Sequence, residues 1–241
     1  MKPTCTYCDN PADTKDHIPP KCLFPKPRPS SLITVPSCSN CNKSYSKDDE
    51  YLRDVLSFRE ELSDNPFIMQ LNNAINRRLD PSRSEGYFNY IHRRMAEEAV
   101  RTEAGIYLGI KATFYEDLSR IERVLERMTK GLYRHCTGNK LTAGFDALVY
   151  TQEYFLSLKR EQKEIFIRCM FQRNLADQEW LTVVPDGFDY KFKASTNTGY
   201  TIWMLRFYSK YYGFAVTLKE TEKENQNKNN PVTYRPCIVT E

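Results

Sequence analysis

The sequence predicts an α+β protein in which a small metal-stabilised module precedes a helical region and a C-terminal α+β region with an antiparallel sheet. Three observations support this order. Two C-x-x-C pairs lie within the first 41 residues, apolar side chains then recur at helical spacing, and four strand-like runs separated by turn signals close the chain. We therefore expect three parts: the metal-stabilised module over residues 1–60, the helical region over residues 61–135 and the α+β region over residues 136–241. The sequence suggests no role for the last part.

Size and charge set loose limits on function. The chain has 241 residues, of which 40% are hydrophobic and 13% aromatic, so it can bury a substantial core. A formal net charge of +4 is compatible with local contact to a polyanion but does not require one, so a nucleic-acid function must rest on a site. No apolar run approaches the roughly 18 residues of a membrane span, and no apolar leader follows Met1. We expect no membrane partner and a cytoplasmic location.

The first fifty residues are rich in proline, cysteine, serine and asparagine and poor in large apolar side chains. Such a segment needs an additional stabilising element, which a bound metal can supply. The two knuckles Cys5-x-x-Cys8 and Cys38-x-x-Cys41 carry four thiols whose spacing suits one tetrahedral Zn²⁺. In a reducing cytosol such usage indicates metal more often than disulfides. Four sulfur ligands leave no open coordination position, so this zinc is expected to be structural and any chemistry to lie elsewhere.

Between the two knuckles, three prolines make residues 21–31 a loop, and the β-branched run LITV predicts a short strand after it. A helix is expected from Ser46 or Lys47 to about Leu62, because its apolar residues recur at helical spacing. Acidic residues 48–50 fall in its early turns, where the helix dipole favours negative charge.

The expected helical region contains three further helices. Asn65-Pro66 predicts an N-cap and a first helical residue, with the helix running to about Leu79. Another helix is expected over roughly residues 85–103. The last carries an apolar stripe over residues 114–132. Its other faces alternate acids with bases, Arg127 among them, which we interpret as a solvated surface rather than a DNA track.

In the C-terminal region, FDALVYT predicts a strand and QEYFLSLKREQKEIFIRCMFQ a helix. LTVVP, FDYKFKA, TIWMLRFY and YYGFAVTL predict four more strands, whose aromatic residues are interpreted as sheet core more readily than as base-stacking platforms. The polar segment 219–230 is expected to be a mobile loop, and VTYRPCIVT a last strand.

The stretch TKDHIPP places a carboxylate, Asp16, beside an imidazole, His17, in a chain with only three histidines. A neutral imidazole can take a proton from water at physiological pH. A carboxylate can hold a hard divalent cation. Together they are what metal-assisted hydrolysis needs, although a structural histidine is the alternative interpretation.

In this order and spacing, CTYC, KDHIPP and LITVPSCSNCN resemble the HNH endonucleases, over roughly residues 4–58. The resemblance implies a ββα-metal finger that encloses one catalytic divalent ion beside a separate structural zinc. It also implies hydrolysis of phosphodiester bonds, DNA being the favoured substrate, to leave 5′-phosphate and 3′-hydroxyl ends. Standalone proteins of this kind suggest a bacterial or phage origin and a role in defence.

Residue by residue, the resemblance implies that His17 is the general base and that Asp16 and Asn42 bind Mg²⁺ or Mn²⁺. Ser31 stands where the family usually has an asparagine before the second strand. A serine hydroxyl can still form a hydrogen bond to the backbone, so we expect the loop under the base to be held less firmly and the site to be retained. The lysines expected to contact phosphates are Lys15, Lys43 and Lys47.

Two other functions stay open from the sequence. The first is a non-catalytic zinc module that binds nucleic acid or protein, which the departure at Ser31 favours. The second is an RNA-cleaving toxin. The sequence does not determine recognition specificity, nor whether the chain forms a homodimer or has a regulatory partner.

Overall fold

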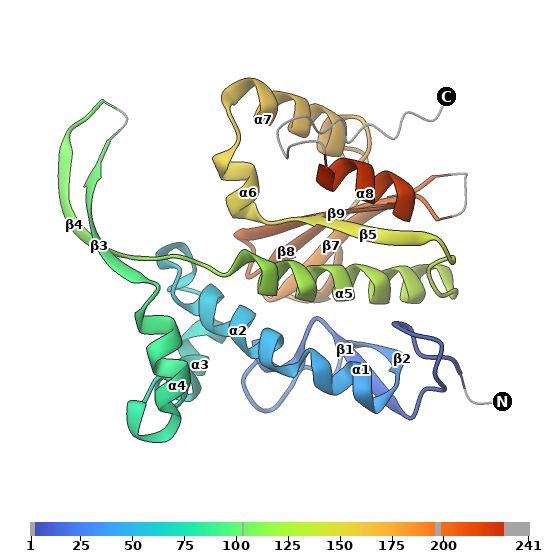
Figure 1. The fold of residues 1–241 in the computed structure, drawn as a ribbon, viewed down its shortest axis with the longest axis horizontal. Helices are drawn as coiled ribbons and strands as arrows, with labels where there is room; N and C mark the ends of the chain where they lie inside the picture. The colour runs from blue at the N-terminus through green and yellow to red at the C-terminus, as the bar shows by residue number, and fades with distance from the viewer. Residues whose placement is uncertain (1–2, 103, 196–198, 229–241) are drawn as a thin grey trace.

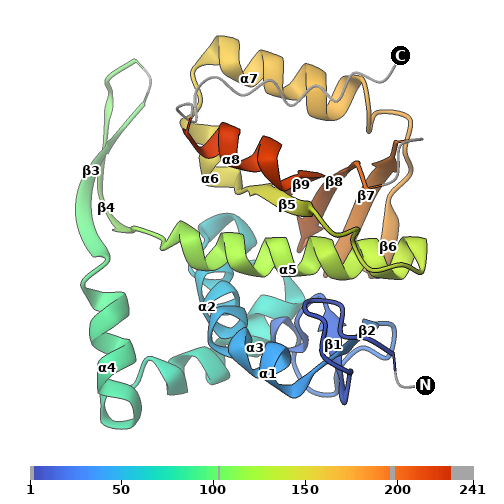
Figure 2. The same ribbon diagram turned by 45° about the vertical axis from the view of Figure 1, so that its right-hand side comes forward.

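The computed structural model describes residues 3–102, 104–195 and 199–228. Over these residues the chain is an α+β protein, as predicted, and it contains three antiparallel sheets. Helix α5 (Leu118–Thr137) lies between the N-terminal module and the largest sheet, and helices α6, α7 and α8 lie on the opposite side of that sheet (Figures 1 and 2). In the described part of the chain, no helix combines the length and apolar character needed to cross a membrane.

The N-terminal module begins with an antiparallel hairpin, in which Asp16 is paired with Val35. A short 3-10 turn lies in the connecting loop, and two helices follow the second strand. The bounds are β1 Thr14–Ile18, 3-10 turn Lys21–Leu23, β2 Ile33–Ser37, α1 Ser39–Ser44 and α2 Ser46–Ser57. The order of two strands and a helix agrees with the expected finger, whose identity as a nuclease finger stays a prediction.

Helix α3 (Pro66–Arg78) begins as predicted, whereas α4 (Pro81–His92) begins earlier than the expected residue 85. Asn65 and Asp80 are the N-caps, and each accepts a hydrogen bond from a backbone N–H two residues on. A proline occupies the first helical position in both helices, where its missing N–H costs nothing.

The prediction of a helix over residues 85–103 is wrong beyond His92. Residues Met95–Arg101 instead form strand β3, which pairs with β4 (Tyr107–Phe114). Alanine and glutamate in β3 favour a helix locally, but pairing with the aromatic and β-branched strand β4 decides the outcome. We call residues 95–114 the arm, because this hairpin projects away from the rest of the molecule (Figures 1 and 2).

The C-terminal strands are confirmed and form a single sheet in the order β5-β9-β8-β7-β6. Their bounds are β5 Phe145–Tyr150, β6 Leu181–Val184, β7 Phe188–Ala194, β8 Thr201–Phe207 and β9 Tyr211–Lys219. The single helix expected after β5 is interrupted at Leu158, whose backbone is extended. The segment becomes α6 (Gln152–Ser157), α7 (Arg160–Phe166) and a π-helical turn (Ile167–Gln172).

Helix α8 (Glu220–Lys228) replaces most of the mobile loop expected over residues 219–230. Two acids in its first turn suit the helix dipole, and Lys223 forms an ion pair with Asp146 on β5. These contacts hold a polar segment whose composition alone suggests disorder. The last predicted strand, VTYRPCIVT, lies outside the described residues.

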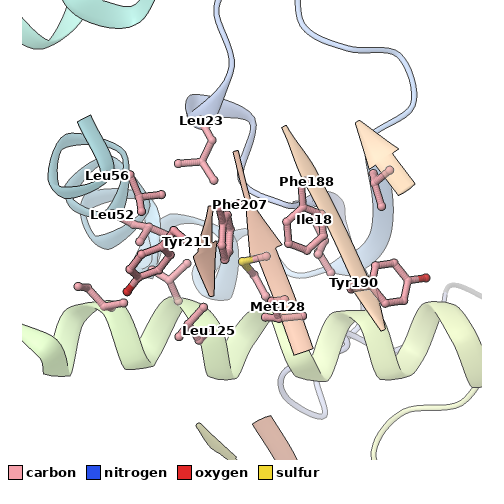
Figure 3. Packing of buried hydrophobic residues seen from close by; sticks show 14 of the residues in the cluster. Ile18, Leu23, Leu52, Leu56, Leu125, Met128, Phe188, Tyr190, Phe207 and Tyr211 are labelled. Carbon is pink, nitrogen blue, oxygen red and sulfur yellow. The ribbon is translucent and has the colours of Figure 1, made fainter. Parts of the chain in front are cut away.

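One hydrophobic core joins all three expected parts of the chain. It contains Ile18 from β1, Leu52 from α2, Met128 from α5 and Phe207 from β8 (Figure 3). Gly131 lets α5 approach β1 closely, because a Cβ atom there would lie 1.9 Å from the Ile18 side chain. The sheet and α5 therefore form the base on which strand β1, with Asp16 and His17, is held.

Candidate functional site

The four knuckle cysteines converge on one point. Cys5 and Cys8 lie in an N-terminal loop closed by the bridge between Thr4 and Pro11, while Cys38 and Cys41 lie at the start of α1. All four Sγ atoms are within 4.8 Å of one another, and those of Cys8 and Cys38 are 3.6 Å apart. Tetrahedral zinc with bonds of about 2.3 Å needs sulfur–sulfur distances of about 3.8 Å, so the cluster fits this metal.

Backbone N–H groups support the sulfurs as thiolates. Tyr7 donates to Cys5 Sγ at 3.4 Å, and Cys41 donates to Cys38 Sγ at 3.5 Å. Burial opposes ionisation of Cys5, but backbone donors from Tyr7, Cys38 and Cys8 lower its pKa to about 7. Burial and the neighbouring sulfurs raise the pKa of Cys41. Four thiolates this close repel one another, so a bound cation is what would stabilise all of them.

We expect the Cys38→Ala variant to lose bound zinc and the ordered fold of the N-terminal module. Cys38 is a member of the cluster and also the N-cap of α1, and metal-binding free energy contributes directly to the folding of small metal-stapled modules. Metal analysis and thermal unfolding of the purified protein would measure both effects. Cys136→Ala, on α5 and outside the cluster, is the matched control. A Cys38→Ala protein that keeps its zinc would refute the structural assignment.

A polar pocket of about 360 Å³ lies beside the cysteine cluster, between β1, the loop after it, α1 and α2. Its lining includes Lys15, Asp16, His17, Lys21, Asn42 and Lys43. The structure therefore places the predicted base and both predicted cation ligands around one cavity. The remaining predicted residues, Ser31 and Lys47, are exposed and do not line it.

Asp16 is buried, with only 4% of its surface exposed, and its carboxylate is surrounded by donors. Arg127 Nη1 contacts Oδ1 at 2.9 Å and Oδ2 at 2.8 Å. Tyr7 donates its hydroxyl to Oδ2 at 2.6 Å, and the His17 backbone N–H donates to Oδ1 at 2.9 Å. A carboxylate offers about four lone-pair positions, so Asp16 has no vacant acceptor position in this arrangement.

The expectation that Arg127 belongs to a solvated surface is wrong. This guanidinium is 2% exposed and also forms an ion pair with Asp49, a second carboxylate that lines the pocket. Burial raises the pKa of Asp49 to about 7, with Arg127 opposing the rise and Asp16 adding to it. One arginine from α5 thus forms ion pairs with the buried Asp16 and the half-buried Asp49 of the N-terminal module.

His17 is half-buried on the strand position that follows Asp16. Burial lowers its pKa, the positive charge of Lys21 lowers it further, and Asp16 acts in the opposite direction. The imidazole is therefore neutral at physiological pH, which is the form that can accept a proton.

Asn42 lies on α1 and forms hydrogen bonds to residues of β1. Its amide nitrogen donates to Thr14 Oγ1 at 3.3 Å and to the carbonyl of Lys15 at 3.2 Å, so the amide oxygen is the atom left for a cation. A catalytic divalent ion thus fits these residues only in part. Asn42 has an oxygen to offer, whereas Asp16 would first have to give up one of its present donors.

Comparisons with family models, curated proteins and solved structures gave no match for this chain. The assignment of the site therefore rests on its own residues. Sequence reasoning missed three of them: Tyr7, Asp49 and Arg127. Tyr7 lies inside the first knuckle and Asp49 in the first turn of α2, but the sequence contains no signal that connects Arg127 to either residue.

Proposed function

We propose that this protein is a metal-dependent HNH-type endonuclease that hydrolyses phosphodiester bonds, with DNA as the favoured substrate. The observation that carries the proposal is the convergence of His17, Asp16 and Asn42 on one pocket. An imidazole, a carboxylate and an amide oxygen are the groups required for activating water and holding a hard cation beside a phosphate.

In this proposal His17 removes a proton from the attacking water, and its lowered pKa keeps it in the neutral form required. Lys15, Lys21 and Lys43 line the same pocket and would hold the backbone phosphates around the scissile bond. Such contacts carry no base specificity, so they predict binding that weakens with salt and depends little on sequence.

Asn42 and Asp16 would hold the Mg²⁺ or Mn²⁺ ion, which would offset negative charge on the leaving oxygen. For this role Asp16 must exchange part of its contact with Arg127 for the ion. The same contact favours the alternative, a non-catalytic zinc module that binds nucleic acid or protein, because a carboxylate that keeps all four of its hydrogen bonds is a structural group.

A cleavage assay with the full-length protein tests the proposal. Supercoiled plasmid, linear duplex DNA and RNA are each incubated with Mg²⁺, with Mn²⁺, and after exhaustive dialysis against metal-free buffer that leaves structural zinc in place. Nicking of DNA that depends on the added ion supports the proposal. Cleavage of RNA alone would favour the toxin function, and binding without cleavage would favour the non-catalytic module.

The acid limb of the pH–rate profile is expected to lie below the ordinary histidine pKa of about 6.5, because burial and Lys21 both disfavour the imidazolium form of His17. Replacing Lys21 with methionine removes the cation, so the pKa of His17 should rise and the acid limb should move to higher pH. Values of kcat/KM measured from pH 5 to 9 would show the shift. Lys47→Met, outside the pocket, should leave the limb in place, and an unmoved limb in Lys21→Met would argue against His17 as the base.

A further inference from the structure

Tyr7 contacts both a cysteine of the metal cluster and an acid of the polar pocket. Its backbone N–H donates to Cys5 Sγ at 3.4 Å, and its hydroxyl donates to Asp16 Oδ2 at 2.6 Å. The second distance is that of a hydrogen bond from a hydroxyl to a charged carboxylate, which is shorter and stronger than a bond between neutral groups. One residue thus interacts with an expected zinc ligand and with an expected ligand of the catalytic ion.

The backbone around Tyr7 is held by the second strand as well as by the cysteine cluster. Thr6 donates its backbone N–H and its hydroxyl to the carbonyl of Pro36 on β2, at 2.9 and 2.8 Å. Pro36 is paired with Lys15, the residue before Asp16 on β1. The first knuckle therefore has a defined position relative to the strand that carries Asp16.

Packing on two sides restricts the side chain of Tyr7. Its ring lies edge-on against Tyr45, which ends α1, and the two ring centroids are 5.9 Å apart. Gly131 on α5 leaves room for the hydroxyl, because a Cβ atom at that position would lie 3.2 Å from the Tyr7 oxygen, closer than side chains normally pack. The hydroxyl is therefore confined beside the carboxylate of Asp16.

Arg127 is the donor to Asp16 that can be displaced by a cation. Its Nη1 contacts both carboxylate oxygens, while its Nη2 already forms an ion pair with Asp49. Movement of the guanidinium toward Asp49 would keep it in an ion pair while a cation takes its place at Asp16. The Tyr7 hydroxyl has no second acceptor among the described residues, so its hydrogen bond to Asp16 would remain.

We propose that Tyr7 is a positioning residue for the divalent ion, because its hydroxyl keeps the Asp16 carboxylate oriented when Arg127 gives way to the ion. The inference rests on the proposed nuclease function, in which Asp16 and Asn42 hold this ion. Carboxylates that ligate a metal are usually hydrogen-bonded by an outer residue, and loss of such a partner typically costs about 10–100-fold in metal affinity or activity.

The Tyr7→Phe variant tests the proposal, because it removes the hydroxyl and keeps the ring. Mn²⁺ binding to the full-length, zinc-loaded protein is measured by isothermal titration calorimetry without nucleic acid, and the Kd of the variant should be raised about 10–100-fold. The Mn²⁺ concentration for half-maximal plasmid nicking should rise by the same factor, while the rate at saturating Mn²⁺ should approach that of the wild type. Metal analysis should show that zinc is retained, since Tyr7 contacts Cys5 through its backbone.

Tyr45→Phe is the matched control. Among the described residues the Tyr45 hydroxyl forms no hydrogen bond, although its ring packs directly against Tyr7, so this variant should bind Mn²⁺ with the wild-type Kd. Asn42→Ala removes the other expected ligand and should weaken the same binding. An unchanged Kd in Asn42→Ala would show that Mn²⁺ binds outside the pocket and would overturn the proposal.

A purely structural role for Tyr7 predicts a different result. Tyr7→Phe would then unfold at a lower temperature but bind Mn²⁺ with the wild-type Kd, which would overturn the positioning role and leave the nuclease function standing. Tighter Mn²⁺ binding would also overturn it, because the hydroxyl would then compete with the ion for Asp16. A wild type that neither binds Mn²⁺ nor cleaves nucleic acid would remove the proposed function and the positioning role together.

Discussion

His17→Ala is expected to reduce nucleic-acid cleavage by about 10²–10⁴-fold while leaving the fold intact, because a general base typically contributes a factor of this size. The side chain is half-buried, and the interaction that ties this residue to Asp16 comes from its backbone N–H, which alanine retains. Initial rates of plasmid nicking, with folding followed by circular dichroism, would measure the two effects separately.

His92→Ala is the matched control, since His92 is an exposed histidine at the end of α4, stacked on Phe88 and remote from the pocket lining. Its cleavage rate should equal that of the wild type. A His17→Ala protein that cleaves as fast as the wild type would remove His17 from the mechanism. The pocket would then be better interpreted as part of a binding module.

The N-terminal half of the site could be predicted from sequence because its residues are encoded locally. The cysteine knuckles, the Asp16-His17 pair and Asn42 lie within 38 residues of one another, and one hairpin and one helix bring them together. The beginning of α3 was also predictable, since an N-cap followed by proline has a local physical cause.

The partners of these residues were not predictable, because they come from distant parts of the chain. Arg127 lies 111 residues after Asp16, in a helix whose acids and bases alternate as on a solvated surface. Only the packing of α5 against α2 and β1 turns that charged side chain inward, and no periodicity in the helix reveals this. The arm was missed for a similar reason, since strand β3 exists only through pairing with β4.

The region beyond residue 60 has a structural role that the sequence did not suggest, because it supplies the counter-charges of acidic residues in the N-terminal module. Helix α5 supplies the guanidinium that holds Asp16 and Asp49, and Arg120 and Arg123 of the same helix pair with Asp48 on α2. The N-terminal module is therefore completed by side chains from outside it. A fragment that ends near residue 60 would leave Asp16, Asp48 and Asp49 without their counter-charges, so the module depends on the rest of the chain.

Arg127→Met is expected to lower the free energy of unfolding by about 3–5 kcal/mol, the usual cost of removing one member of a buried ion pair. The side chains of Arg127 and Asp16 are 1% and 6% exposed, so water cannot replace the lost guanidinium. Asp49 loses the same partner. Urea unfolding at pH 7 would measure the change. Arg123→Met provides the control on the same helix, since its side chain is 52% exposed and should cost less than about 1 kcal/mol.

The deficit of Arg127→Met should depend on pH in a definite direction. Burial already raises the pKa of Asp49 to about 7, and losing Arg127 removes the charge that opposes this rise. The folded variant therefore binds protons more readily than its unfolded chain, whose aspartates titrate near 3.9. The Asp49 part of the deficit relative to wild type should be complete above the folded pKa of the variant, which lies above 7, and should shrink as pH falls through about 7, below which Asp49 is protonated in both folded proteins. A deficit that grows on acidification would show that Arg127 does not neutralise Asp49, and it would contradict the electrostatic link between α5 and the pocket.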